Sequence, residues 1–304
     1  MFKKKNTTKI NESVGDRVFN IITSIILILV ILIVGYPCLF VVSCSFSSAH
    51  ALQAGQVVLW PVEFSLSAYE FILEFKQVWV GYRNSIFYTV LGTIIGMIMR
   101  ILAAYPLSRK TFQGRGIYMK LFYFTTLFGA GLIPSFILHV NLGMFNTIWP
   151  TVLAAAISVS DIIILRTAFA SSIPGDLFDA AKIDGANDFQ CLLKIALPLA
   201  KATLSVLVLY CIVAHWNEYF TSMIYLVGKP ELEPLQLVLR PIMTAASASI
   251  ATGEMSSTAQ NLANEGLDGV RYGLIVISTV PALLAYFCVQ KYFKGGVMVG
   301  SVKG

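Results

Sequence analysis

One run of five residues combines titratable, amide and aromatic side chains inside an otherwise apolar stretch: His215, Trp216, Asn217, Glu218 and Tyr219. Amides and carboxylates can hydrogen-bond the hydroxyls of a sugar, and aromatic rings can stack on its flat apolar faces. If the stretch is a helix, His215 and Glu218 share a face with Ser222. The run therefore predicts either a polar, aromatic wall of a translocation path, or side chains of His215 and Glu218 that pair with each other or with a partner subunit and only fix helix packing.

A histidine beside a glutamate could also serve as the acid–base pair of a hydrolase. Such a site needs a nucleophile or metal ligands at the same depth, but the 3 histidines of the chain include no His-x-x-x-His pair. The cysteines are scattered without any Cys-x-x-Cys pair: Cys38, Cys44, Cys191, Cys211 and Cys288. These patterns argue against an enzyme, a metal site and a disulfide framework.

Charged side chains occur at two further places within apolar stretches. Asp161 lies shortly before Arg166, and Arg100 lies near the end of a different stretch. A charge at the centre of a membrane helix costs about 2.5–3.5 kcal/mol and therefore needs a partner or water. We expect structural pairing of Asp161 with Arg166, and pairing or snorkelling for Arg100.

The elements that position these residues are apolar enough to cross a membrane. Hydrophobic residues make up 57% of the 304 residues and charged residues only 12%. Several stretches can cross about 30 Å of hydrocarbon as helices. Gly129, Gly131 and Pro134 in the third stretch, and Pro281 in the sixth, favour close packing or a kink. We predict an all-α membrane protein with six transmembrane helices, near residues 18–43, 84–107, 117–139, 147–168, 202–227 and 272–290.

Basic residues predict the orientation of these helices. They gather before the first span, between the second and third, between the fourth and fifth, and after the last: Lys3, Lys4, Lys5, Lys9, Arg17, Arg109, Lys110, Arg115, Lys120, Lys182, Lys194, Lys201, Lys291, Lys294 and Lys303. The positive-inside rule makes these segments, and both termini, cytoplasmic. Topology thus explains the net charge of +6, so we expect contact with membrane lipid and no nucleic acid partner.

The cytoplasmic segment between the fourth and fifth spans, residues 171–198, carries the signals of a short helix. Pro174 suits a first helical turn, and the acidic Asp176 and Asp179 favour the positive end of a helix. Gly185 can end the helix in a left-handed conformation. The segment therefore begins with a helix that stops at a sharp turn.

A second short helix is expected after that turn. Asn187 or Asp188 can cap it, and apolar residues recur at helical spacing until Pro198 interrupts the pattern. The result is a helix-turn-helix with small and apolar faces. These signals alone leave two interpretations open, an ordinary amphipathic connector under the membrane or a docking element.

The amino-acid sequence of this segment resembles a motif of a known protein family. Asp179-Ala180-Ala181, then Gly185, then Ile195-Ala196-Leu197-Pro198 stand at the separations of the EAA loop in permeases of ATP-binding-cassette (ABC) importers. The resemblance is closest to carbohydrate importer permeases of the maltose type, in a branch that takes complex oligosaccharides. Asp179 stands where the family has glutamate, which keeps the charge but shortens the side chain by one methylene.

The resemblance implies one permease domain over residues 1–304, with the type I ABC importer fold, in a bacterial cell membrane. It implies an extracellular loop at 228–270 and a cytoplasmic tail at 291–304. The implied partners are a second homologous permease, a dimer of ATPase subunits, an extracellular sugar-binding protein and a carbohydrate substrate, an oligosaccharide in this branch. Coupling to the ATPases would fall on Asp179, Ala180, Ala181, Asp184 and Gly185.

No P-loop glycine motif occurs in the chain, so we expect ATP and Mg²⁺ to bind the partner ATPase subunits and no cofactor to bind here. A secondary transporter or channel subunit that works without ATP is the alternative. That alternative would leave the sequence match to the EAA loop unexplained.

Overall fold

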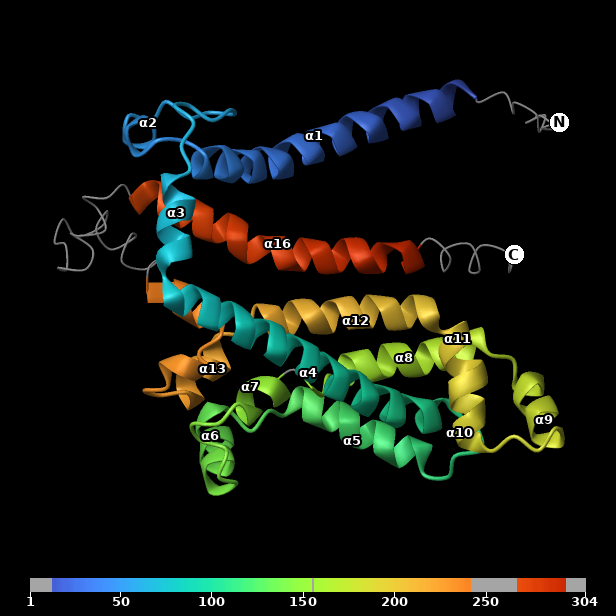
Figure 1. Ribbon diagram of the computed structural model, residues 1–304. Helices are drawn as coiled ribbons and strands as arrows, with labels where there is room; N and C mark the ends of the chain where they lie inside the picture. The colour runs from blue at the N-terminus through green and yellow to red at the C-terminus, as the bar shows by residue number, and fades with distance from the viewer. Residues whose placement is uncertain (1–12, 155, 242–266, 294–304) are drawn as a thin grey trace. The chain divides into compact units, whose positions relative to one another are not determined.

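The computed structural model describes residues 13–154, 156–241 and 267–293, and these ranges are predominantly helical (Figure 1). The longer helices are α1 (Val14–Ser45), α4 (Lys76–Ser108), α5 (Arg115–Leu127), α6 (Leu132–Asn141), α8 (Val159–Ser172), α12 (Lys201–Trp216) and α16 (Leu267–Phe293). The shorter ones are α2 (Ala49–Gln53), α3 (Ser67–Glu74), α7 (Trp149–Leu153), α9 (Gly175–Ile183), α10 (Asp188–Cys191), η1 (Leu192–Ala196), α11 (Leu197–Leu199), α13 (Phe220–Tyr225) and η2 (Pro230–Leu232). The described part of the chain confirms the all-α prediction.

Contacts within the chain define two compact units. The first contains the described residues up to Tyr69 and the part of α16 that ends at Val276. The second contains the other described residues, including all the residues that the sequence singles out for function. Much of the predicted outer loop and of the predicted cytoplasmic tail lies outside the described residues.

Among the described residues, three helices are long and apolar enough to cross a membrane: Val14–Ser45, Lys76–Ser108 and Gly269–Tyr292. They correspond to the first, second and sixth predicted spans. Two pairs of consecutive helices with a bend between them are also long and apolar enough when each pair is taken together. If each pair forms one span, the number of candidate spans rises to as many as five. Pro281 lies inside α16, as expected for a tolerated proline in an apolar helix.

The predicted third span, 117–139, is not one continuous helix. It consists of α5 and α6, which meet at an angle of 113°. Gly131 lies between them with a φ of +82°, a backbone conformation that costs glycine little and other residues more. Its neighbourhood of glycines and Pro134 accounts for the bend, so the predicted irregularity is confirmed while the single helix is wrong.

The predicted fourth and fifth spans are also interrupted. α7 ends at Leu153 and α8 begins at Val159, where the side chain of Ser158 accepts a hydrogen bond from the backbone N–H of Asp161. In the fifth, α12 ends at Trp216 and α13 begins only at Phe220. The prediction of one continuous helix over 202–227 is therefore wrong at the polar run that was predicted to do chemistry.

In the first unit, hydroxyl groups at the end of α1 hold the chain that follows. Ser43 donates a hydrogen bond of 2.6 Å to the Leu59 carbonyl, and Ser45 accepts one of 2.8 Å from the Tyr69 hydroxyl. The rings of Phe46 and Phe64 stack with centroids 5.7 Å apart. The long apolar body of α1 is exposed instead, as expected for a helix surrounded by lipid.

In the second unit, α4 packs against α8 and α12 (Figure 1). Two glycines of α4 make the close approach possible. A Cβ on Gly96 would lie 3.1 Å from the Ala156 carbonyl oxygen, and one on Gly92 would collide with the ring of His215. Small residues at such crossings let membrane helices gain packing contacts. Leu165 and Leu207 are fully buried in the core that results.

We expect Gly92→Ala to destabilise this packing by about 1–3 kcal/mol, the usual cost of overfilling a packed core. The added methyl group would also approach the Val152 carbonyl oxygen to 2.9 Å. Gly116→Ala is the matched control because a Cβ there meets nothing within 4 Å. Thermal unfolding in detergent measures the difference. Equal stability of the two variants would contradict the close packing at Gly92.

Candidate functional site

The first helix of the predicted coupling segment, α9, ends in a left-handed turn that favours glycine. The backbone N–H of Gly185 donates to the Lys182 carbonyl at 3.0 Å, and that of Ala186 donates to the Ala181 carbonyl at 2.9 Å. These two bonds form a Schellman motif, with Gly185 at a φ of +79°. The predicted helix stop is confirmed, and it fixes the direction in which the chain leaves α9.

The second helix begins with a capping box. Asn187 accepts a hydrogen bond of 2.8 Å from the backbone N–H of Gln190, whose side chain accepts one of 3.0 Å from the backbone of Asn187. Of the two predicted caps, Asn187 is therefore the one used. The helix continues through a π-helical turn, η1, and through α11, and then meets α12 at an angle of 84°.

One aromatic side chain anchors α9 to the helices behind it. Phe178 is buried, and the guanidinium carbon of Arg109 lies 3.4 Å from the centre of its ring. The ring of Tyr105 packs against both Phe178 and Phe169. A cation over an aromatic face contributes about 0.5–2 kcal/mol, depending on its desolvation. The end of α4 is thereby linked mechanically to α9.

The opposite side of this segment has no covering element within the described chain. Among its apolar side chains, Ile183 is 88% exposed. Four of the five predicted coupling residues are exposed, and Ala181 is half-buried: Asp179, Ala180, Ala181, Asp184 and Gly185. An exposed apolar face next to small residues suits the docking of another protein.

The predicted path residues divide into two groups. His215 is buried, and its ring nitrogens lie 2.9 Å from the Cys211 carbonyl oxygen and 3.1 Å from that of Val152. Glu218 instead accepts a hydrogen bond of 2.7 Å from the backbone N–H of Thr221, at the start of α13. The helix break separates the two side chains, so the structure contains no His215–Glu218 pair and no shared face.

Trp216 has a structural role that the sequence did not reveal. Pro281 has no N–H, so the nearby carbonyls of α16 need other donors. The indole of Trp216 donates to the Ser278 carbonyl at 2.8 Å, and the Tyr82 hydroxyl donates to the Ile277 carbonyl. A tryptophan that was predicted to line a path therefore stabilises a proline-containing helix.

Asn217 and Tyr219 are the exposed members of the run. The side-chain amide nitrogen of Asn217 donates to the Val213 carbonyl at 3.0 Å. The guanidinium of Arg240 lies 5.5 Å from the ring centre of Tyr219. This exposed amide, phenol and cation are the polar groups at the helix break that a passing molecule could reach.

A buried charged network crosses the centre of the second unit. Nε of Arg100 on α4 lies 3.3 Å from a carboxylate oxygen of Asp161 on α8, with both side chains largely buried. The thiol of Cys211 on α12 also lies close to Arg100. Arg166, the predicted partner of Asp161, donates to the Leu107 carbonyl instead, at 3.1 Å. The prediction of an Asp161–Arg166 pair is wrong because α4 places Arg100 within reach.

The first described part of the predicted outer loop is held against α4. Asn84 donates to the carbonyls of Glu231 and Glu233, and Tyr88 donates to that of Leu232. Burial, and then the nearby charge of Glu231, raise the pKa of Glu233 above its ordinary value. The loop therefore starts from a fixed base.

Comparison with known proteins identifies the family. The chain is 35% identical over 289 residues to the polygalacturonan/rhamnogalacturonan transport system permease protein YtcP of Bacillus subtilis (strain 168), across 95% of this chain and 99% of that protein. It is 32% identical to Protein LplC of the same organism, across 88% and 89%. No protein-family model matches the sequence.

A solved structure supports the same conclusion. A chain of a bacterial ABC transporter involved in the import of the acidic polysaccharide alginate has a TM-score of 0.81 and 34% identity, across 94% of this chain and all of that one. The present chain belongs to the sugar ABC transporter permease family. The family resemblance inferred from the EAA motif is thereby confirmed. The chain is an integral membrane protein with an ABC importer permease fold.

Membership in this permease family gives the buried network a membrane context. A charge that is taken out of water needs a well-placed partner, and removal of one partner of a buried pair costs about 3–5 kcal/mol. The ion pair of Arg100 and Asp161 is such a buried pair, and it links α4 to α8. Neither residue was assigned a partner correctly from sequence, because positions 61 residues apart carry no local signal of their contact.

We expect Arg100→Met to destabilise the permease by about 3–5 kcal/mol, since it leaves Asp161 unpaired. The double variant Arg100→Met/Asp161→Leu should recover most of that loss. Arg166→Met serves as a control, because that guanidinium donates to the Leu107 carbonyl and forms no ion pair within the described residues. Denaturation in detergent measures all three. A double variant as unstable as Arg100→Met would contradict the pairing.

Proposed function

We propose that this chain is one of two permease subunits in an importer that also contains two ATPase subunits and an extracellular binding protein. The single observation that carries this proposal is the coupling segment, α9 to α11, anchored at Phe178 and exposed on its other face. Family membership supports the same assembly. ATP and Mg²⁺ would bind the ATPase subunits, and this chain would contribute no catalytic residue.

Coupling would pass through the contacts that hold α9. Closure of the ATPases moves α9, and the contact between Phe178 and Arg109 carries the movement to the end of α4. Asp179, Ala180, Ala181, Asp184 and Gly185 would form the docked surface. The spanning helices would then alternate between inward-facing and outward-facing arrangements.

Six spans with both termini in the cytoplasm remain the proposed topology. α1, α4 and α16 would each form one span, and the three others would be the interrupted segments α5–α6, α7–α8 and α12–α13. Non-helical backbone at membrane depth is tolerated where protein buries it or where it lines a water-filled cavity. The basic residues beside α9 and between α4 and α5 support a cytoplasmic location for those segments.

The helix break at the polar run would face the transported molecule. His215 and Trp216 would hold the break in place through their backbone partners, and Glu218 would cap α13. Asn217 and Tyr219 would offer an amide and an aromatic face to a sugar. Broken helices in other transporters form substrate sites in this way.

The substrate would be an oligosaccharide, and acidic fragments are the first candidates. One relative is named for polygalacturonan and rhamnogalacturonan, and the solved relative is involved in the import of alginate. Arg240, above the ring of Tyr219, places a positive charge where a uronate carboxylate could pair with it.

The coupling role predicts a graded series at Gly185. Gly185→Val should reduce carbohydrate uptake at least about tenfold, since a β-branched residue is strained at positive φ. Gly185→Asn should keep most of the uptake, because asparagine tolerates this conformation. A Cβ meets nothing within 4 Å, so both variants should insert normally. Uptake by cells with matched membrane levels tests this. Equal uptake by the two variants would contradict a role for the turn.

The substrate proposal predicts which sugar stimulates ATP hydrolysis by the complete assembly with its binding protein. Oligogalacturonates should stimulate hydrolysis more than neutral oligosaccharides of equal length. Tyr219→Ala and Arg240→Gln should raise the sugar concentration needed for half-maximal stimulation by about tenfold, as expected when one stacking or charge-assisted contact is lost. Stronger stimulation by the neutral sugars would overturn the preference for acidic ones.

A further inference from the structure

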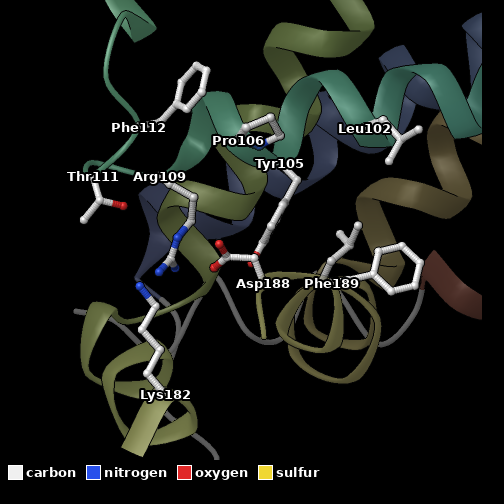
Figure 2. Close-up of a pocket in the computed structure, with 10 residues that line it drawn as sticks. Leu102, Tyr105, Pro106, Arg109, Thr111, Phe112, Lys182, Asp188 and Phe189 are labelled. Carbon is white, nitrogen blue, oxygen red and sulfur yellow. The ribbon is translucent and has the colours of Figure 1, made fainter. Parts of the chain in front are cut away.

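A cavity of about 410 Å³ lies where the end of α4 meets the coupling segment (Figure 2). Its lining comes from α4, from the turn after it, and from α9, α10 and η1. The coupling route described above passes through Arg109, one of the lining residues, but assigns no role to the cavity itself. Its side chains combine cations, a hydroxyl and apolar groups, the complement of an amphiphilic anion.

Two cations line this cavity against one carboxylate. Arg109 and Lys182 make no ion pair within the described residues, although each lies on the same cavity wall as Asp188. In Figure 2 the Lys182 amine and the Arg109 guanidinium approach each other from α9 and from the end of α4. Like charges so placed repel unless an anion joins them. The lining carries one net positive charge, which a singly charged anion would neutralise.

One of the lining residues, Tyr105, carries a buried hydroxyl group. Tyr105 is 8% exposed, and within the described structure its hydroxyl has no hydrogen-bond partner. Burial of a hydroxyl without a partner costs about 1–3 kcal/mol in proteins. In Figure 2 this hydroxyl points toward Asp188, in the middle of the lining. Within the described residues, the group is therefore a donor without an acceptor.

Most of the remaining lining is apolar, and two of its large side chains are exposed. Leu102, two turns before the end of α4, is 51% exposed, and Phe189 is 61% exposed. Figure 2 shows these two side chains at one end of the cavity, and Arg109, Thr111 and Lys182 at the other. A single free anion would need the polar end only. An apolar wall beside it suits a molecule with an anionic head and acyl chains.

We propose that this cavity binds the phosphodiester headgroup of an anionic inner-leaflet phospholipid, held by Arg109, Lys182 and the Tyr105 hydroxyl. The proposal rests on the cytoplasmic orientation that the proposed function gives to α9. A phosphodiester carries one negative charge, so it neutralises the site, and its oxygens accept from all three groups. The bound headgroup would bridge α4 and α9, the two elements through which coupling passes.

The experiment uses the purified complete assembly in detergent, with lipid binding followed by native mass spectrometry. The probes are phosphatidylglycerol, zwitterionic phosphatidylcholine and inorganic phosphate. The test variants are Tyr105→Phe and the double variant Arg109→Gln/Lys182→Gln. The matched control, Lys120→Gln/Lys194→Gln, removes the same charge at exposed positions that do not line the cavity.

The wild-type assembly should retain phosphatidylglycerol in preference to phosphatidylcholine. Its affinity should fall about tenfold in Tyr105→Phe and at least as much in the double variant, as expected for the loss of hydrogen bonds to a charged group. The control should bind as the wild type does. Tyr105→Phe should not lower the melting temperature in lipid-free detergent, since it removes only a hydroxyl without a partner.

Three results would overturn the proposal: no preference for phosphatidylglycerol, an equal loss in the control, or a lower melting temperature that accounts for the loss in Tyr105→Phe. Binding of inorganic phosphate in place of the lipid would overturn the lipid as its source. Sugar-stimulated ATP hydrolysis in the same preparation separates this inference from the proposed function. Sugar-stimulated hydrolysis without specific lipid binding would contradict only the lipid site. Specific lipid binding without sugar-stimulated hydrolysis would contradict the proposed function.

Discussion

The constraint that shapes this permease is that polar groups in apolar surroundings must find partners within the protein. Arg100 of α4 and Asp161 of α8 satisfy each other at 3.3 Å, and the thiol of Cys211 on α12 also lies close to Arg100. Three helices meet at this network. Gly92 of α4 leaves room for the ring of His215, which lies against the Val152 carbonyl, and Gly96 leaves room for the backbone of Ala156.

The same constraint explains how the interrupted helices are tolerated. A break or a proline frees backbone carbonyls, and the fold supplies a donor for several of them from a neighbouring helix. The Trp216 indole donates to the Ser278 carbonyl, and the Tyr82 hydroxyl donates to the Ile277 carbonyl. Where donors are arranged in advance, irregular backbone can lie next to a path without unravelling. The exposed Asn217 and Tyr219 are then presented at a rigid position.

The coupling segment follows a different principle, because most of its surface is left for partners. Local hydrogen bonds shape it: the Schellman turn at Gly185 and the capping box at Asn187. Phe178 alone is deeply buried in α9 and ties it to α4 through Arg109. A segment that is rigid through its local hydrogen bonds and anchored at one buried side chain can transmit a movement of its partner to the spanning helices without being part of the core.

The sequence by itself determined the features that depend on composition and on near neighbours. Long apolar stretches predicted the helices, and Gly185 with Asn187 predicted the helix-turn-helix, because hydropathy and capping act within a few residues. Partner choice for Arg100 and the break in the fifth stretch were decided only by the tertiary structure. Those outcomes depend on which side chains other helices bring within a few ångströms, and a linear pattern carries no record of that distance.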